Sequence, residues 1–205
     1  MPTFRLTYFD APGRAEPIRV AMFLAKLPFE DRRIKFPEFM ALKEQGAFPL
    51  GTVPMLEIDG RPIVQTGAIL RYIARLGAPA MYPSDPFAGL LVDSVLDTLN
   101  DTVSHAMRPS LFERDVAKKI EMRKALLDGA LGAALRYIEG AIGDGPFVTG
   151  GELTIADLVV GDTYRQYKSG TMDGLSVDTL APYPKIVRLG EAYLAHPGLV
   201  AYAAR

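Results

Sequence analysis

Apolar and polar residues alternate with two different periods along this chain. Near the N-terminal end, Phe4, Leu6 and Tyr8 alternate with polar neighbours, and this period of two predicts a half-buried strand. Residues 14–26 then carry apolar side chains at helical spacing, and a second short strand is expected at Glu30–Ile34. A strand, a helix and a strand in this order form the unit from which parallel sheets are built.

The following segment predicts a β-hairpin. Residues 36–53 are expected to be irregular, because they contain three residues that interrupt regular structure: Gly46, Pro49 and Gly51. Beyond them, Met55–Ile58 and Pro62–Val64 flank the pair Asp59-Gly60, which favours a tight turn between two strands. Thr66 to Leu76 is then expected to be a helix that Gly77 closes.

These elements predict a small α/β domain of order βαβ-ββα over residues 1–77. A linker rich in proline and glycine follows at residues 78–86. From residue 87 to 205 strand patterns nearly vanish, and the second domain is expected to be all-helical. Its helix-period segments are Leu90 to Met107, Arg114 to Ile142, Thr154 to Lys168 and Pro184 to Leu194.

Composition excludes several classes of function. The formal net charge of −1 over 205 residues gives no electrostatic footprint for nucleic acid or an anionic membrane. The absence of cysteine excludes a disulfide framework, a thiolate metal site and a cysteine nucleophile. His105 and His196 lie far apart without a partner pattern, so no metal site is expected. With neither a signal peptide nor a membrane span in the pattern, we expect a cytoplasmic protein.

Three local features could carry chemistry, and each has an ordinary alternative. Tyr8 ends the first strand, where a phenol could donate a hydrogen bond to an anion, or could simply pack. A cis Val53-Pro54 bond would present the backbone of Val53 to an extended peptide, whereas a trans bond would be a plain turn. Thr66, after Gln65, is expected to cap a helix whose first N–H groups could bind a carboxylate, or only to cap it.

Taken together, these motifs resemble a known family. The N-terminal half contains Tyr8-Phe-x-x-x-Gly-Arg-Ala-Glu-x-Ile-Arg19, Glu30-Asp-x-Arg33, Val53-Pro-x-Leu56 and Gln65-Thr-x-Ala-Ile-x-Arg-Tyr72. The C-terminal half contains Val92-Asp-x-x-x-Asp-x-x-x-Asp101 and Leu153-Thr-Ile-Ala-Asp-Leu158. The whole chain resembles the cytosolic glutathione transferases, and within them the tyrosine-dependent, sigma-like branch that includes the glutathione-dependent prostaglandin D synthases.

The resemblance implies a thioredoxin-like first domain, a helical second domain, a homodimer and glutathione as co-substrate, without a metal. It implies Tyr8 and Arg14 as the catalytic residues. The glutathione site would comprise Tyr8, Arg14, Phe39, Lys43, Val53, Pro54, Gln65 and Thr66, with Asp101 from the partner subunit. The residues expected to line the electrophile pocket are Phe9, Ala11, Ser104, Met107, Arg108 and Tyr164.

The chain departs from the usual pattern of this branch at three positions. Phe39 stands where tryptophan is usual, and phenylalanine lacks the indole N–H that would donate to the glycyl end of glutathione. Thr66 replaces serine and keeps the hydroxyl, and Pro12 replaces an arginine near the electrophile pocket. Thr154 and Asp157 predict a capping box, and hence a role in folding rather than in catalysis.

The implied activity is conjugation of the glutathione thiolate to small hydrophobic electrophiles, as in detoxification. Two alternatives stay open: a glutathione-dependent isomerase like the prostaglandin D synthases, and a non-catalytic ligand-binding or structural protein of the same fold.

Overall fold

The structure is a computed structural model that describes residues 2–77 and 81–205, except for the side chains of residues 101 and 102. The chain divides into two compact units, one ending at Met81 and the other beginning at Tyr82. Of the linker predicted at residues 78–86, residues 78–80 lie outside the described part of the chain. Pro86, the last residue of that range, is already the first residue of a helix.

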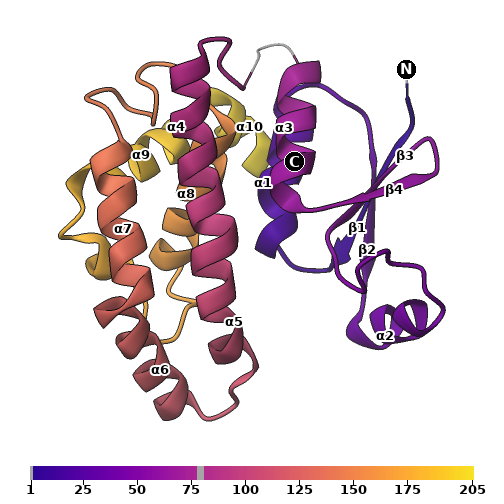
Figure 1. The fold of residues 1–205 in the computed structure, drawn as a ribbon, viewed down its shortest axis with the longest axis horizontal. Coiled ribbons are helices and arrows are strands. Elements are labelled where there is room, and N and C mark those ends of the chain that lie inside the picture. Colours follow the sequence, from indigo (N-terminus) through magenta and orange to yellow (C-terminus); the bar gives the residue numbers. More distant parts are fainter. Residues whose placement is uncertain (1, 78–80) are drawn as a thin grey trace. The chain divides into compact units, whose positions relative to one another are not determined.

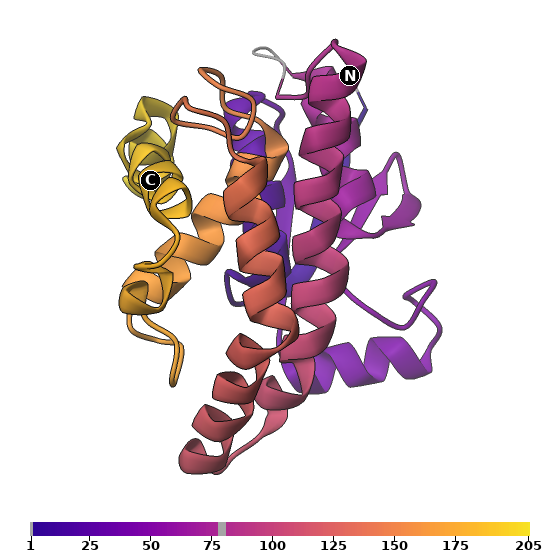
Figure 2. The same ribbon diagram turned by 60° about the vertical axis from the view of Figure 1, so that its left-hand side comes forward.

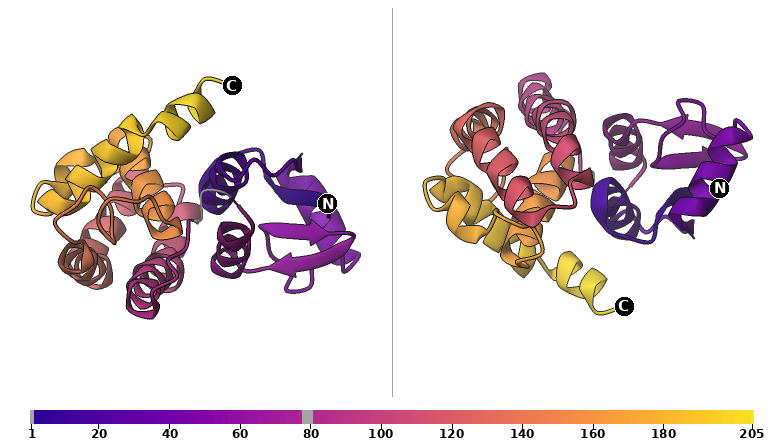
Figure 3. Two further views of the ribbon diagram at one scale, coloured as in Figure 1. Left: turned by 90° about the horizontal axis from the view of Figure 1, so that it is seen from above. Right: turned by 90° about the horizontal axis from the view of Figure 1, so that it is seen from below.

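The first unit is a four-stranded sheet with helices on both faces (Figures 1 and 3). In chain order its elements are β1 (Phe4–Phe9), the 3₁₀ turn η1 (Gly13–Ala15), α1 (Glu16–Leu24), β2 (Glu30–Ile34), α2 (Phe36–Glu44), β3 (Met55–Ile58), β4 (Arg61–Val64) and α3 (Thr66–Leu76). The strand order is β2-β1-β3-β4, with β1 and β2 parallel and the other pairs antiparallel. Helices α1 and α3 pack side by side on one face, and α2 lies on the other. The predicted α/β fold is confirmed.

Helix α2 corrects one expectation, because residues 36–53 are not irregular throughout. The helix begins at Phe36, and Pro37 suits its first turn because a proline there gives up no helical hydrogen bond. Only Phe39 of this helix is buried. The expectation gave weight to the glycines and the proline of the segment and overlooked the helical spacing of Phe36, Phe39 and Met40. Beyond α2, the positive φ angles of Gly46 and Gly51 mark the turns that lead to β3.

The second unit is helical, as expected, but its helices are shorter and more numerous than the sequence segments. Its elements are α4 (Pro86–Asp97), the π-helical turn η2 (Thr98–Val103), α5 (Ser104–Phe112), α6 (Val116–Asp128), α7 (Ala130–Ala141), α8 (Ile155–Lys168), the 3₁₀ turn η3 (Val177–Leu180), α9 (Pro184–Ala195) and α10 (Pro197–Ala203). The segment 114–142, expected to be continuous, is interrupted at Gly129, whose backbone leaves the helical region. Among the helices of the described ranges, none combines the length and the apolar character that a membrane span requires.

The core of this unit forms around α8, which packs against α4 and α9, while α4 and α7 run side by side (Figure 2). Helices α8 and α9 approach each other closely because a tyrosine ring packs directly against a glycine at two positions. A Cβ at Gly161 would lie 2.2 Å from the ring of Tyr193, and one at Gly190 would lie 2.1 Å from the ring of Tyr164. The crossing therefore requires glycine at both positions.

The capping box at the start of α8 is confirmed. Asp157 is fully buried and accepts hydrogen bonds from the backbone N–H and the hydroxyl of Thr154, at 2.7 and 2.6 Å. Its other carboxylate oxygen accepts from the backbone N–H of Val148 at 2.7 Å. Burial raises the pKa of Asp157 to about 6, although these donors act in the opposite direction. The predicted role in folding therefore has a concrete form: Asp157 fastens the loop before α8 to the helix.

Candidate functional site

The strand register brings three segments of the predicted site to one edge of the sheet. Thr7 of β1 lies opposite Met55 of β3, and Met55 also lies opposite Val64 of β4. The C-terminal ends of β1 and β4 and the N-terminal end of β3 therefore meet at the same edge. The segments that adjoin these ends are Tyr8, Val53-Pro54 and Gln65-Thr66.

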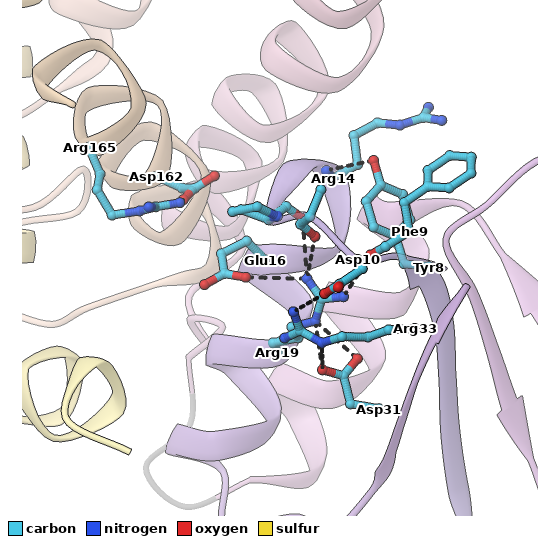
Figure 4. A network of polar contacts seen from close by, with 12 residues as sticks. Tyr8, Phe9, Asp10, Arg14, Glu16, Arg19, Asp31, Arg33, Asp162 and Arg165 are labelled. Carbon is cyan, nitrogen blue, oxygen red and sulfur yellow. Dashed lines mark hydrogen bonds and ion pairs between the residues drawn. The ribbon is translucent and has the colours of Figure 1, made fainter. Parts of the chain in front are cut away.

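Tyr8, Arg14 and Val53 are joined by hydrogen bonds at this edge. Tyr8 is largely buried, and its hydroxyl oxygen accepts from the backbone N–H of Arg14 at 3.2 Å (Figure 4). The guanidinium Nη2 of Arg14 donates to the carbonyl oxygen of Val53 at 2.9 Å, and the Val53-Pro54 bond is cis. Because the oxygen of Tyr8 already accepts, its own O–H proton is left to donate to a bound group.

Gly13 is part of this arrangement, although sequence reasoning gave it no role. Its φ angle of +45° lies in the left-handed region, and a Cβ at this position would lie 2.6 Å from the hydroxyl oxygen of Tyr8. Any side chain would therefore push against the phenol. The signal in the sequence is the glycine that follows Pro12 immediately before a helix, at the point where the backbone must approach the end of β1.

Phe39 belongs to an aromatic cluster between β1 and α2. Its ring centroid lies 5.2 Å from that of Phe9 in an edge-on arrangement and 5.4 Å from that of Phe48 in a stacked one. The ammonium of Lys43 lies 5.9 Å from the centroid of Phe39, within the range of a cation–π contact. A Cβ at Gly51 would lie 3.1 Å from Cε of Lys43, so the lysine stem also rests on this loop. Phe39 therefore packs in the position where a tryptophan is usual, but it lacks the indole N–H donor.

The start of α3 corrects the expectation that Thr66 caps this helix. The capping position is occupied by Gln65, which has a φ angle of +78°, and no side chain caps the helix there. Thr66 is the first helical residue and is 8% exposed. A capping residue needs a non-helical backbone, and here Gln65 takes that conformation. The first N–H groups of α3 still lack helical acceptors, as in any helix, so they are available to an anion.

The residues expected in an electrophile pocket are distributed over both units. Phe9 is half-buried and Ala11 is exposed in the first unit, whereas Ser104, Met107 and Arg108 lie on α5 in the second. The hydroxyl of Ser104 donates to the carbonyl of Leu99 at 3.1 Å, Met107 is buried and Arg108 is exposed. The side chain of Asp101 lies outside the described residues.

Tyr164 does not suit the pocket in which it was expected. Its side chain is 2% exposed, its ring packs against Gly190, and its hydroxyl donates to Glu191. Burial and the carboxylate of Glu191 raise the pKa of Tyr164 to about 12. We therefore correct this assignment: Tyr164 stabilises the packing of α8 on α9.

Comparison with known proteins decides the family. Residues 4–75 match the model of the glutathione S-transferase N-terminal domain, and residues 100–205 match that of the glutathione S-transferase C-terminal domain. The chain belongs to the glutathione S-transferase family. The prediction of a glutathione transferase, made from the motifs, is thereby confirmed, and glutathione is the substrate of this family.

Relatives of this transferase carry three kinds of name. It is 32% identical to glutathione S-transferase 1 of Ascaris suum over 86% of this chain and 85% of the relative. It is 30% identical to the hematopoietic prostaglandin D synthase of Gallus gallus, with 98% and 96% covered, and 31% identical to S-crystallin SL11 of Nototodarus sloanii, also with 98% and 96% covered. Among solved structures, NaGST-2 superposes with a TM-score of 0.84 at 29% identity, covering 100% of this chain and 97% of that one. These relatives confirm the sigma-like assignment.

Proposed function

We propose that this transferase holds the sulfur of glutathione as a thiolate through the hydroxyl of Tyr8. The observation that carries the proposal is the hydrogen bond from the Arg14 backbone N–H to the Tyr8 oxygen, which leaves the phenolic proton for the sulfur. A free thiol has a pKa of about 8.5, and a hydrogen bond to a charged acceptor is worth about 1.5–3 kcal/mol. One such bond lowers the thiol pKa by about one to two units, so thiolate becomes the main species near neutral pH.

Glutathione carries charges that match the residues around this edge. The γ-glutamyl carboxylate suits the N-terminus of α3, with Gln65 and the hydroxyl of Thr66. The backbone of its cysteinyl residue suits Val53, which the following Pro54 places at the start of β3. The glycyl carboxylate suits Lys43, whose stem is supported by Phe39 and Gly51.

The second substrate in this proposal is a small hydrophobic electrophile. Attack by the thiolate on such a compound is the chemistry of detoxification. Arg14, whose backbone already contacts Tyr8, is the second residue to which we assign a catalytic role. The chain's cytoplasmic location stays a prediction.

Isomerisation is the second candidate activity, since some relatives are named prostaglandin D synthases. A non-catalytic role, as the name of the S-crystallin relative implies for that protein, is the third. Turnover of a chromogenic aryl halide together with assay of free glutathione separates them. Conjugation consumes glutathione, isomerisation of a suitable substrate regenerates it, and a carrier or structural protein does neither. We expect conjugation.

A homodimer also belongs to the proposal. Phe87 and Leu90 on α4 expose 66% and 61% of their surface, and exposed apolar residues that lie close together commonly mark an interface. Asp101 of the partner subunit would then bind the γ-glutamyl ammonium. Sedimentation at micromolar concentration tests the dimer, and Asp101→Asn should weaken glutathione binding about tenfold to a hundredfold. A monomer that binds glutathione normally would contradict this part of the proposal.

A further inference from the structure

Arg19 of α1 is a charged residue in the core of the first unit. Its side chain has no exposed surface, and a buried guanidinium is tolerated only when its charge is paired and its donors are used. Its Nε donates to both carboxylate oxygens of Asp31 at 3.0 and 3.1 Å, and Nη1 lies 3.3 Å from the carboxylate of Glu16. In the sequence, Arg19 is conspicuous between the apolar residues Ile18 and Val20.

The other donors of Arg19 hold the loop that joins β1 to η1. Nη1 donates to the carbonyl of Ala11 at 2.8 Å and to that of Pro12 at 3.3 Å, and Nη2 donates to that of Phe9 at 3.5 Å (Figure 4). One buried side chain therefore binds three carbonyl groups within the four residues Phe9–Pro12, the last residue of β1 and the loop that follows it.

This loop connects the two residues of the proposed thiolate site. Tyr8 directly precedes it, and Arg14 follows it after Gly13. The path of the loop sets the 3.2 Å distance between the Arg14 N–H and the Tyr8 oxygen. The guanidinium carbon of Arg19 also lies 5.9 Å from the centroid of the Tyr8 ring. Arg19 thus contacts both the loop, through its hydrogen bonds, and the ring of Tyr8.

A second, more exposed arginine also binds this loop. Arg33 on β2 donates from Nε to Asp31 at 2.9 Å and from Nη1 to Asp10 of the loop at 3.0 Å. Asp31 thus pairs with both guanidinium groups, and the charge of Arg19 is paired with Asp31 and Glu16. We assign the effect of Arg19 on the site to position, because its hydrogen bonds reach the backbone of the loop.

We infer that Arg19 is a positioning residue for thiolate formation: by holding the Phe9–Pro12 loop, together with Arg33, it sets the Arg14 N–H against Tyr8. This inference rests on the proposed function of Tyr8. A misplacement of about 1 Å in a catalytic arrangement can cost two orders of magnitude in rate, so a support of this kind has a measurable effect.

The experiment compares three variants of the full-length protein. Arg19→Lys keeps the charge but loses the planar fork of donors. Arg33→Ala removes the ion pairs of Arg33 with Asp10 and Asp31, and Arg5→Ala is its matched control. Arg5 is also a strand arginine, it is similarly exposed (46% against 42%), and it also pairs with two carboxylates. The measurements are kcat with an aryl halide, the Kd of glutathione, the apparent pKa of the bound thiol from its ultraviolet thiolate absorbance, and hydrogen exchange of the Ala11 amide.

We expect kcat of Arg19→Lys to fall about tenfold or more and the apparent pKa of the bound thiol to rise, with the glutathione Kd within about threefold of wild type. Arg33→Ala should lower kcat about two- to fivefold and speed exchange of the Ala11 amide, which donates to Phe9 at 2.8 Å. Arg5→Ala should change neither kcat nor the exchange of the Ala11 amide. If Arg19→Lys does not fold, the comparison of Arg33→Ala with Arg5→Ala tests the inference in its place.

Two results would overturn the inference while leaving the proposed function intact. One is a folded Arg19→Lys protein with wild-type kcat and a wild-type apparent pKa of the bound thiol. The other is an Arg33→Ala protein that matches Arg5→Ala in turnover and in exchange. A wild-type protein that neither turns over glutathione nor binds it as a thiolate would refute the proposed function, and the inference with it, before any variant is compared.

Discussion

Substitution of Gly13 by alanine tests how closely the backbone must approach Tyr8. The added Cβ would lie 2.6 Å from the Tyr8 hydroxyl oxygen, which is shorter than non-bonded contacts allow, and 3.0 Å from Cε1 of the ring, which is at their lower limit. The phenol or the loop must therefore shift by several tenths of an ångström. Alanine also takes the left-handed φ of +45° at a cost of about 1–2 kcal/mol.

The two effects appear in different measurements. The backbone cost lowers the free energy of unfolding by about 1–2 kcal/mol, whereas the displaced hydroxyl lowers kcat by about ten- to a hundredfold. Glutathione affinity should stay within a few-fold of wild type, because most of it comes from the charged ends of the tripeptide. The assays are steady-state kinetics with an aryl halide, glutathione binding by calorimetry, and denaturant unfolding.

Gly60→Ala is the matched control for this experiment. Gly60 lies in the turn between β3 and β4 with a φ angle of +81°, and a Cβ there would meet no atom within 4 Å. It carries the backbone cost without the contact to Tyr8. Gly60→Ala should therefore lose stability but keep its turnover. Equal turnover in Gly13→Ala and wild type, or an equal loss in both variants, would refute the reasoning.

Two further predictions concern Asp157 and Thr66. Because burial raises the pKa of Asp157 from 3.8 to about 6, the stability contributed by its carboxyl group is present below pH 4 and is lost as pH rises through about 6. The destabilisation caused by Asp157→Ala should therefore shrink by about 2 kcal/mol between pH 4 and pH 8 in denaturant unfolding, and a destabilisation that grows with pH would contradict this. Thr66→Ala should weaken glutathione binding about tenfold through loss of one hydrogen bond to a carboxylate, while thermal stability stays unchanged because Thr66 caps nothing. Thr66→Ser, which keeps the hydroxyl, should restore the affinity, and equal binding by both variants would place the hydroxyl outside the site.

Local pattern was enough to predict most of the first unit. The strands at Phe4–Phe9 and Glu30–Ile34, the hairpin around Asp59-Gly60 and the helix from Thr66 follow from periodicity and turn chemistry. Helix α2 was missed because the glycines and the proline that follow it were taken to interrupt the whole segment.

What could not be predicted depends on contacts between residues far apart in the chain or on backbone angles. The approach of Gly161 to Tyr193 joins two helices, and no local signal records it. Whether Gln65 or Thr66 occupies the capping position of α3 depends on which of them has the non-helical backbone, and residue preference alone favours threonine. Arg19 was visible as a charge in an apolar run, but its partners appear only once the loop folds back over α1.

The role of Tyr8 is tested most directly by the apparent pKa of enzyme-bound glutathione in the wild-type protein and in Tyr8→Phe. The thiolate is followed by its ultraviolet absorbance as pH is varied with glutathione at saturation. We expect the wild-type protein to bind the thiol with a pKa about one to two units below the free value of about 8.5. Tyr8→Phe should return it to near the free value, with glutathione affinity changed only a few-fold and turnover strongly reduced. The same depressed pKa in both proteins, with undiminished turnover of the variant, would contradict the assignment of Tyr8.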